Sequence, residues 1–175
     1  MGADTSGGTL KVDYLLEEGL LYPFEGAPIF EIYKLPGHSS DSLGILLSEE
    51  QLMFVGDVVF RHGPTVVFHP DGNLADYLAS LDLLEDLVNL GKVNVFFPGH
   101  GHPIVDPLRS IRATRNHRIE RLDQVKQALA AGVSRDADSL FDAVYEGVDE
   151  HLRWASLRSI EAQLVYLDSE QSEGL

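Results

Sequence analysis

Three segments of the chain share one layout, in which an apolar run ends at a small-residue turn and a metal-binding side chain follows. They are residues 35–38 (LPGH), 54–57 (FVGD) and 96–100 (FFPGH). Strand ends on one edge of a sheet converge, and glycine allows the sharp turns. Zinc accepts imidazole and carboxylate ligands. Each segment alone is an ordinary loop, but the repetition predicts one metal site built from His38, Asp57 and His100.

The composition limits how such a site can be built. The chain of 175 residues contains no cysteine, so any metal must be held by His, Asp or Glu. Hydrophobic residues make up 44% and the net charge is −15, which predicts a folded core and disfavours non-specific nucleic-acid binding. No apolar run reaches the roughly 18 residues of a membrane span. No secretory signal is visible, and we expect a cytoplasmic protein, or a mitochondrial one if an N-terminal address is missing.

The periodicity of apolar residues predicts a mixed α/β chain. Strands are expected within 28–37, on both sides of a polar turn at Ser48–Gln51, and within 93–103; helices are expected over 74–91, 107–131, 138–146 and 149–168. We divide the chain into a disordered N-terminus (1–8), an α/β part with its long helix (9–132), a helical C-terminal subdomain (133–168) and a polar tail (169–175).

Several of these segments together resemble a known family. The stretch LPGHSSDSLGILLSEEQLMFVGDVVF, followed by FFPGHGHPIVDP and HRIERLDQV, resembles the second half of the metallo-β-lactamase fold. The similarity is to the subgroup of metallo-β-lactamase-like endoribonucleases and fungal polyketide thioesterases. It implies part of an αββα sandwich, followed by a small winged-helix-like, all-helical subdomain.

The resemblance assigns roles to the three candidate ligands. It implies that His38 binds one zinc ion, that Asp57 bridges two and is catalytic, and that His100 binds the second. In the family these metals hold a hydroxide that attacks an acyl or phosphoryl centre. The family's first metal motif, His-x-His-x-Asp-His, is missing, and no histidine precedes His38. We therefore expect at most partial zinc occupancy and leave open whether this chain is itself an enzyme.

Other histidines offer alternatives. His100-Gly101-His102 is an H-x-H pair, and on extended backbone its rings would face the same way. With His38 and Asp57 it could form a mononuclear site. His62, Thr65 and His102 are candidate substrate contacts at the rim, whereas His117 is expected to serve helix packing or hydrogen bonding.

Arginines recur every third residue at 109, 112, 115, 118 and 121. They could form a basic strip for phosphate, either RNA or the phosphopantetheine arm of an acyl carrier. Alternatively, they pair with Glu120, Asp123 and the acidic helix around 82–86, and the net charge favours this second interpretation.

The favoured function is hydrolysis of a thioester or other ester-like bond, on a small-molecule or acyl-carrier-linked substrate. An endoribonuclease of the same fold ranks second, and the rival of a different class is a non-catalytic binding or scaffold module. We also expect one sheet face, with Ile45, Leu47 and Phe54, to be uncovered unless a partner or a missing N-terminal half covers it.

Overall fold

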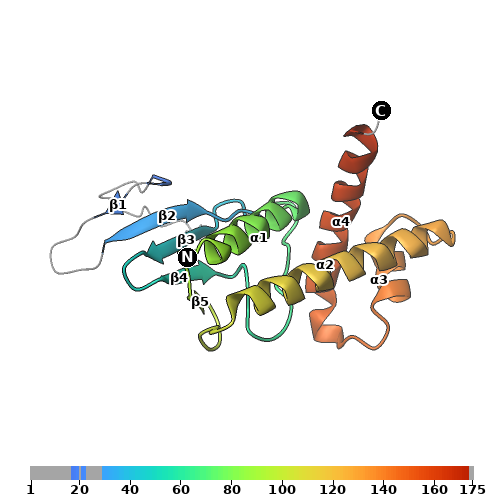
Figure 1. Cartoon of the computed structure of the whole chain (residues 1–175). Helices are drawn as coiled ribbons and strands as arrows, with labels where there is room; N and C mark the ends of the chain where they lie inside the picture. The colour runs from blue at the N-terminus through green and yellow to red at the C-terminus, as the bar shows by residue number, and fades with distance from the viewer. Residues whose placement is uncertain (1–16, 20, 23–28, 174–175) are drawn as a thin grey trace, which may run out of the picture.

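The computed structural model describes residues 17–19, 21–22 and 29–173. Its strands and helices follow one another in the order expected for a mixed α/β chain (Figure 1). They are β1 (Leu21–Tyr22), β2 (Phe30–Lys34), β3 (Leu43–Leu47), β4 (Leu52–Gly56), α1 (Leu74–Asn89), β5 (Val95–Pro98), α2 (Pro107–Ala130), α3 (Ala137–Val144), the 3-10 turn η1 (Glu150–Leu152) and α4 (Arg153–Glu173). The predicted mixed α/β class is confirmed.

The strands form one five-stranded sheet in chain order. β2 pairs antiparallel with β3, and β3 with β4 as the hairpin predicted around Ser48–Gln51. β5 pairs parallel with β4 after a crossover through α1. Because two antiparallel steps restore the direction, β2, β4 and β5 all run the same way. Their C-terminal ends therefore lie on one edge of the sheet.

The two faces of the sheet differ in what covers them. Leu46, Met53 and Phe96 lie in register on one face and are fully buried in a core that includes Leu81 and Leu84 of α1. On the opposite face Phe54 is 43% exposed. Ile45 and Leu47 on that face are half-buried. The alternation follows from the period-2 geometry of strands, and Phe54 matches the predicted uncovered face.

The C-terminal third is helical, as predicted, and shares the same core. Leu140 of α3 and Ile160 of α4 belong to the same cluster of buried residues as the core-facing side chains of the sheet. α2 ends close to the expected position, and Gly132 then adopts a φ of +90°. Within described residues 133–173 there is no strand, and the winged-helix likeness and the division into domains stay predictions.

The last helix is longer than expected. α4 continues to Glu173, past the predicted end at 168 and into the predicted tail. Ion pairs hold this end, because Asp168 binds Arg135 and Glu170 binds Lys126 of α2. The predicted disordered segment 1–8 lies outside the described residues. None of the helices in the described part of the chain combines the length and apolarity needed to cross a bilayer.

Candidate metal centre

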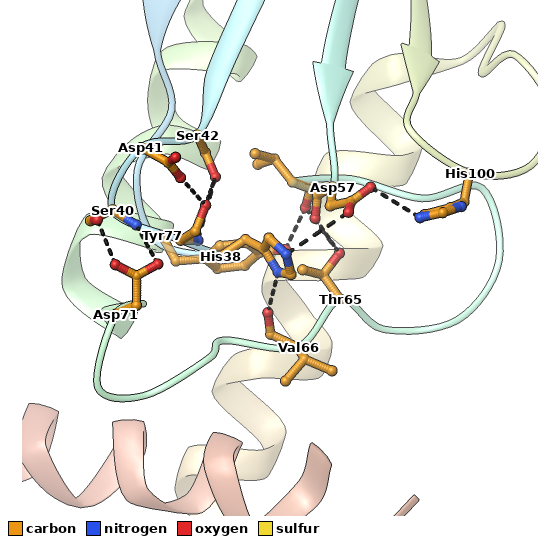
Figure 2. Close-up of polar contacts among 12 residues, drawn as sticks. His38, Ser40, Asp41, Ser42, Asp57, Thr65, Val66, Asp71, Tyr77 and His100 are labelled. Atoms are coloured by element: carbon orange, nitrogen blue, oxygen red, sulfur yellow. Dashed lines mark hydrogen bonds and ion pairs between the residues drawn. The ribbon is translucent and has the colours of Figure 1, made fainter. Parts of the chain in front are cut away.

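The three predicted ligands meet at the edge where β2, β4 and β5 end (Figure 2). Asp57 follows β4 directly and lies between two imidazoles. His38 Nε2 is 3.9 Å from one carboxylate oxygen, Oδ2, and His100 Nε2 is 3.8 Å from the other, Oδ1. Both distances exceed a hydrogen bond, so each oxygen faces a ring nitrogen across a gap.

A backbone contact fixes the tautomer of His38. Its Nδ1 lies 2.7 Å from the carbonyl oxygen of Val66. Because a carbonyl can only accept, Nδ1 carries the proton and donates it. Nε2 then has a free lone pair directed toward Asp57. This is the arrangement in which a histidine serves as a metal ligand, with its second nitrogen held by an outer partner.

Two hydrogen bonds stabilise the turn that carries Asp57. Thr65 Oγ1 donates to the backbone oxygen of Asp57 at 2.9 Å, and Gly99 N donates to Gly56 O at 2.7 Å. Thr65 is only 2% exposed, so the structure places it beneath the loop. Its predicted substrate contact stays a prediction.

The turn that carries His38 is anchored by α1. Gly37 has a φ of +128° and packs directly on the Tyr77 backbone, where any Cβ would collide. Ser80 Oγ donates to Pro36 O at 2.7 Å, and the Tyr77 hydroxyl donates to Val58 O at 2.5 Å, just after Asp57. Sequence reasoning missed Tyr77 and Ser80. They sit within an amphipathic helix, and nothing in the local pattern separates them from packing residues.

The donor set is correct in type but small in number. One imidazole and one carboxylate oxygen face each gap, whereas a zinc site uses three or four protein ligands. No group of three or more His, Cys, Asp or Glu side chains among the described residues is arranged to hold a metal ion. The expectation of at most partial zinc occupancy stays a prediction.

The extended H-x-H geometry behind the mononuclear alternative is absent. Gly101 has a φ of +87°, and the turn closes where Phe96 and Ile104 exchange two backbone hydrogen bonds. His100 and His102 are therefore not on extended backbone, and within the described residues no contact joins His102 to Asp57. The prediction of a site with both histidines was wrong in its geometry.

The rim histidines lie on the surface. His62 and His102 are both exposed, and His62 lines a cavity beside the site. The ring of His100, whose side chain is 79% exposed, packs edge-on against Phe60 at a centroid distance of 6.0 Å. The predicted substrate contacts of His62 and His102 stay predictions.

Two known proteins are similar to this chain in sequence. An atrochrysone carboxyl ACP thioesterase from a Cryptosporiopsis species is 33% identical over 119 residues, which cover 68% of this chain and 34% of the relative. A beta-lactamase-like protein 2 homolog of Caenorhabditis elegans is 27% identical over 94% of this chain and 52% of its own length. No protein-family model matches the sequence. The chain spans about a third to a half of the curated relatives it matches.

Solved structures show the same fold. A metallo-beta-lactamase family protein from Thermus thermophilus superposes with a TM-score of 0.75 at 26% identity, over 89% of this chain and 49% of that protein. A beta-lactamase domain protein from Burkholderia ambifaria gives a TM-score of 0.71 at 24% identity, over 89% and 47% of the two chains.

Proposed function

Because this chain has the metallo-β-lactamase fold, we propose that it forms part of a metal-dependent hydrolase that cleaves an ester-like bond, with a thioester as the favoured substrate. The observation that carries the proposal is the position of Asp57. Its two carboxylate oxygens each face the Nε2 atom of a different histidine. Both distances are longer than a hydrogen bond, as the separation of two ligands that share one ion would be.

The residues fit zinc in kind. His38 and Asp57 would hold one ion, and His100 and Asp57 a second, with Asp57 as the shared bridge. Bound there, zinc would polarise the scissile carbonyl and activate water. The tautomer fixed by Val66 keeps His38 Nε2 available for this role. The two donors facing each gap fall short of three, so the remaining ligands would come from polypeptide outside the described residues.

The thioester preference rests on the relatives. One of the similar proteins is a carboxyl ACP thioesterase, and it overlaps 68% of this chain. An endoribonuclease finds no comparable support, because two arginines of the predicted basic strip bind the acidic residues of α1. The non-catalytic binding module has one observation in its favour, namely that the described residues place no third ligand at either gap.

Zinc binding to the purified chain tests the proposal. We expect weak, reversible zinc uptake by titration calorimetry and little zinc after dialysis, because the described residues would offer each ion two protein ligands. His38→Ala and Asp57→Asn should each weaken uptake at least about tenfold, since even outer-shell changes reach that size. His102→Ala is the matched control and should leave uptake unchanged.

Three results would count against this account. Retention of one or more zinc ions per chain after dialysis would show that the site is complete. Loss of uptake in His102→Ala would restore the mononuclear alternative. Zinc uptake that is insensitive to both His38→Ala and Asp57→Asn would leave the non-catalytic module as the better account.

A further inference from the structure

The arginine row on α2 divides into two groups with different surroundings. Arg112 Nε lies 3.0 Å from Glu85 Oε1, and Arg115 binds both Glu85 and Asp82 of α1. These two arginines lower the pKa of the Glu85 carboxyl, chiefly through the hydrogen bond from Arg115. The predicted pairing with the acidic helix is therefore confirmed for Arg112 and Arg115. Their guanidinium groups form ion pairs that link α2 to α1.

Arg118 has no carboxylate partner among the described residues. It is 4% exposed, yet its Nε and Nη2 are buried there without a hydrogen-bond partner. Its nearest aromatic contact is the Tyr77 ring, whose centroid lies 5.7 Å from the guanidinium carbon. A buried guanidinium without a counter-charge is costly, because its donors have left water without replacement. Nε and Nη2 have almost no accessible surface, so a ligand beside Arg118 would reach the guanidinium through its third nitrogen, Nη1, which is not one of the buried nitrogens without a partner.

A cavity of about 610 Å³ lies at Arg118. One face of α2 lines it with donors at helical spacings, namely Arg109, Ser110, Thr114, His117 and Arg118. No ion pair joins the Arg109 guanidinium to another described residue. Asp106 is the one carboxylate in the lining, and it accepts from the backbone N–H of Arg109 as the cap of α2.

The cavity also has an apolar part and adjoins the candidate metal centre. Phe60, Pro64, Ile104 and Val105 contribute to its wall. The Phe60 ring packs against His100, so the cavity reaches the edge of the sheet where Asp57 lies. Its volume is that of a small organic ligand rather than of a single ion.

We propose that this cavity binds an organic phosphate, with Arg118 and Arg109 pairing the phosphate oxygens and the apolar wall holding the attached chain. With Arg61, which also lines the cavity, three guanidiniums and two hydroxyls provide more donors than one carboxylate can accept, and guanidinium groups suit the oxygens of a phosphate. The proposal deepens the proposed thioesterase function, because such a phosphate joins a pantetheine arm to its carrier. A single cavity favours this ligand over RNA, which would need an extended basic surface.

The test compares pantetheine 4′-phosphate with pantetheine by calorimetry on the metal-free chain. We expect the phosphate form to bind at least about tenfold more tightly, because charge-assisted hydrogen bonds to arginine form only with the phosphate. Arg118→Gln should remove that difference, and Arg109→Gln should reduce it. Arg112→Gln is the matched control from the same row and should leave it unchanged.

The wild-type chain supplies a second readout that does not depend on any variant folding. Burial, and then the charges of Arg118 and Arg121, hold the pKa of His117 below its ordinary value. A phosphate in the cavity would offset those charges, so the pKa of His117, followed by NMR, should rise when pantetheine 4′-phosphate is added. Pantetheine should not change it.

Equal binding of pantetheine and its phosphate would overturn the proposal. So would a pantetheine carboxylate analogue that binds as tightly as the phosphate, or a short single-stranded RNA that competes through Arg118 when the phosphate form does not bind. None of these outcomes depends on zinc. Failure here would therefore leave the metal-centre proposal standing, and the reverse also holds.

Discussion

At the scale of single residues, Asp57 depends on a glycine that lies far from it in the sequence. Gly99 packs against the carboxylate, and a Cβ at this position would overlap Asp57 Oδ1. That oxygen is the one that faces His100. Gly99 therefore provides room for the carboxylate, which is a different role from the sharp turn that the Pro-Gly pattern suggests.

We expect Gly99→Ala to displace the Asp57 side chain and to weaken zinc uptake at least about tenfold, as does loss of other groups that orient ligands. Calorimetric zinc titration measures this effect. Gly101→Ala is the control in the same turn. It has open space around its Cβ but a φ of +87°, so it should cost about 1–2 kcal/mol of stability without moving Asp57. Unchanged zinc uptake in Gly99→Ala would contradict the assigned role.

At the scale of elements, α1 acts as the support of the candidate site. Tyr77 and Ser80 lie one turn apart on its buried face, and their hydroxyls bind the backbones of the two ligand-bearing turns. The N-terminus of α1 adds a third tie, because Asn73 N donates to Gly37 O at 3.1 Å. The helix thus fixes the relative positions of His38 and Asp57, as well as covering the sheet.

We expect Ser80→Ala to lower the free energy of unfolding by about 1 kcal/mol, because it leaves the part-buried carbonyl of Pro36 without its partner. Ser169→Ala is the matched control. Ser169 also donates to a backbone carbonyl, that of Tyr166, but it is exposed on α4, and its loss should cost less than about 0.5 kcal/mol. Urea denaturation measures both values. Equal costs would show that Ser80 is not a specific support.

At the scale of the whole molecule, the face of the sheet opposite the buried core carries exposed apolar side chains. Figure 1 shows the sheet and the helices that follow it. Phe54 and Leu43 are 43% and 41% exposed, and the Phe54 ring contacts Phe97 at 5.5 Å between centroids. Aromatic and aliphatic side chains gathered on one face favour association with other apolar surfaces. This face, rather than the charged surface, is where we expect self-association.

We expect the chain to self-associate at micromolar concentrations, and Phe54→Lys to weaken that association at least about tenfold, because burying a phenylalanine is worth about 1.5–3 kcal/mol. Leu90→Lys provides the control. Leu90 is 71% exposed but lies at the end of α1, away from this face, and its replacement should have no effect. Sedimentation velocity over a concentration series distinguishes the variants. A wild-type chain that stays monomeric throughout would contradict the prediction.

The sequence by itself determined the elements and the three side chains of the candidate metal centre. Period-2 and period-3.6 patterns, the Pro-Gly turns and the helix-ending glycines are local signals, so they placed β2 to β5 and the helices within a few residues. The repeated strand–turn–ligand layout was enough to bring His38, Asp57 and His100 to one edge, because parallel strands end together.

Only the tertiary structure decided which side chains support that site and which are available to a ligand. Arg112, Arg115 and Arg118 look alike in a row of threes, but each step of three residues falls short of a full helical turn. The row therefore rotates from the acidic surface of α1 into the interior. Arg112 and Arg115 form ion pairs with Glu85 of α1, whereas Arg118 is buried beside a cavity. Such differences depend on contacts between residues far apart in the sequence, and these contacts cannot be predicted from local sequence patterns.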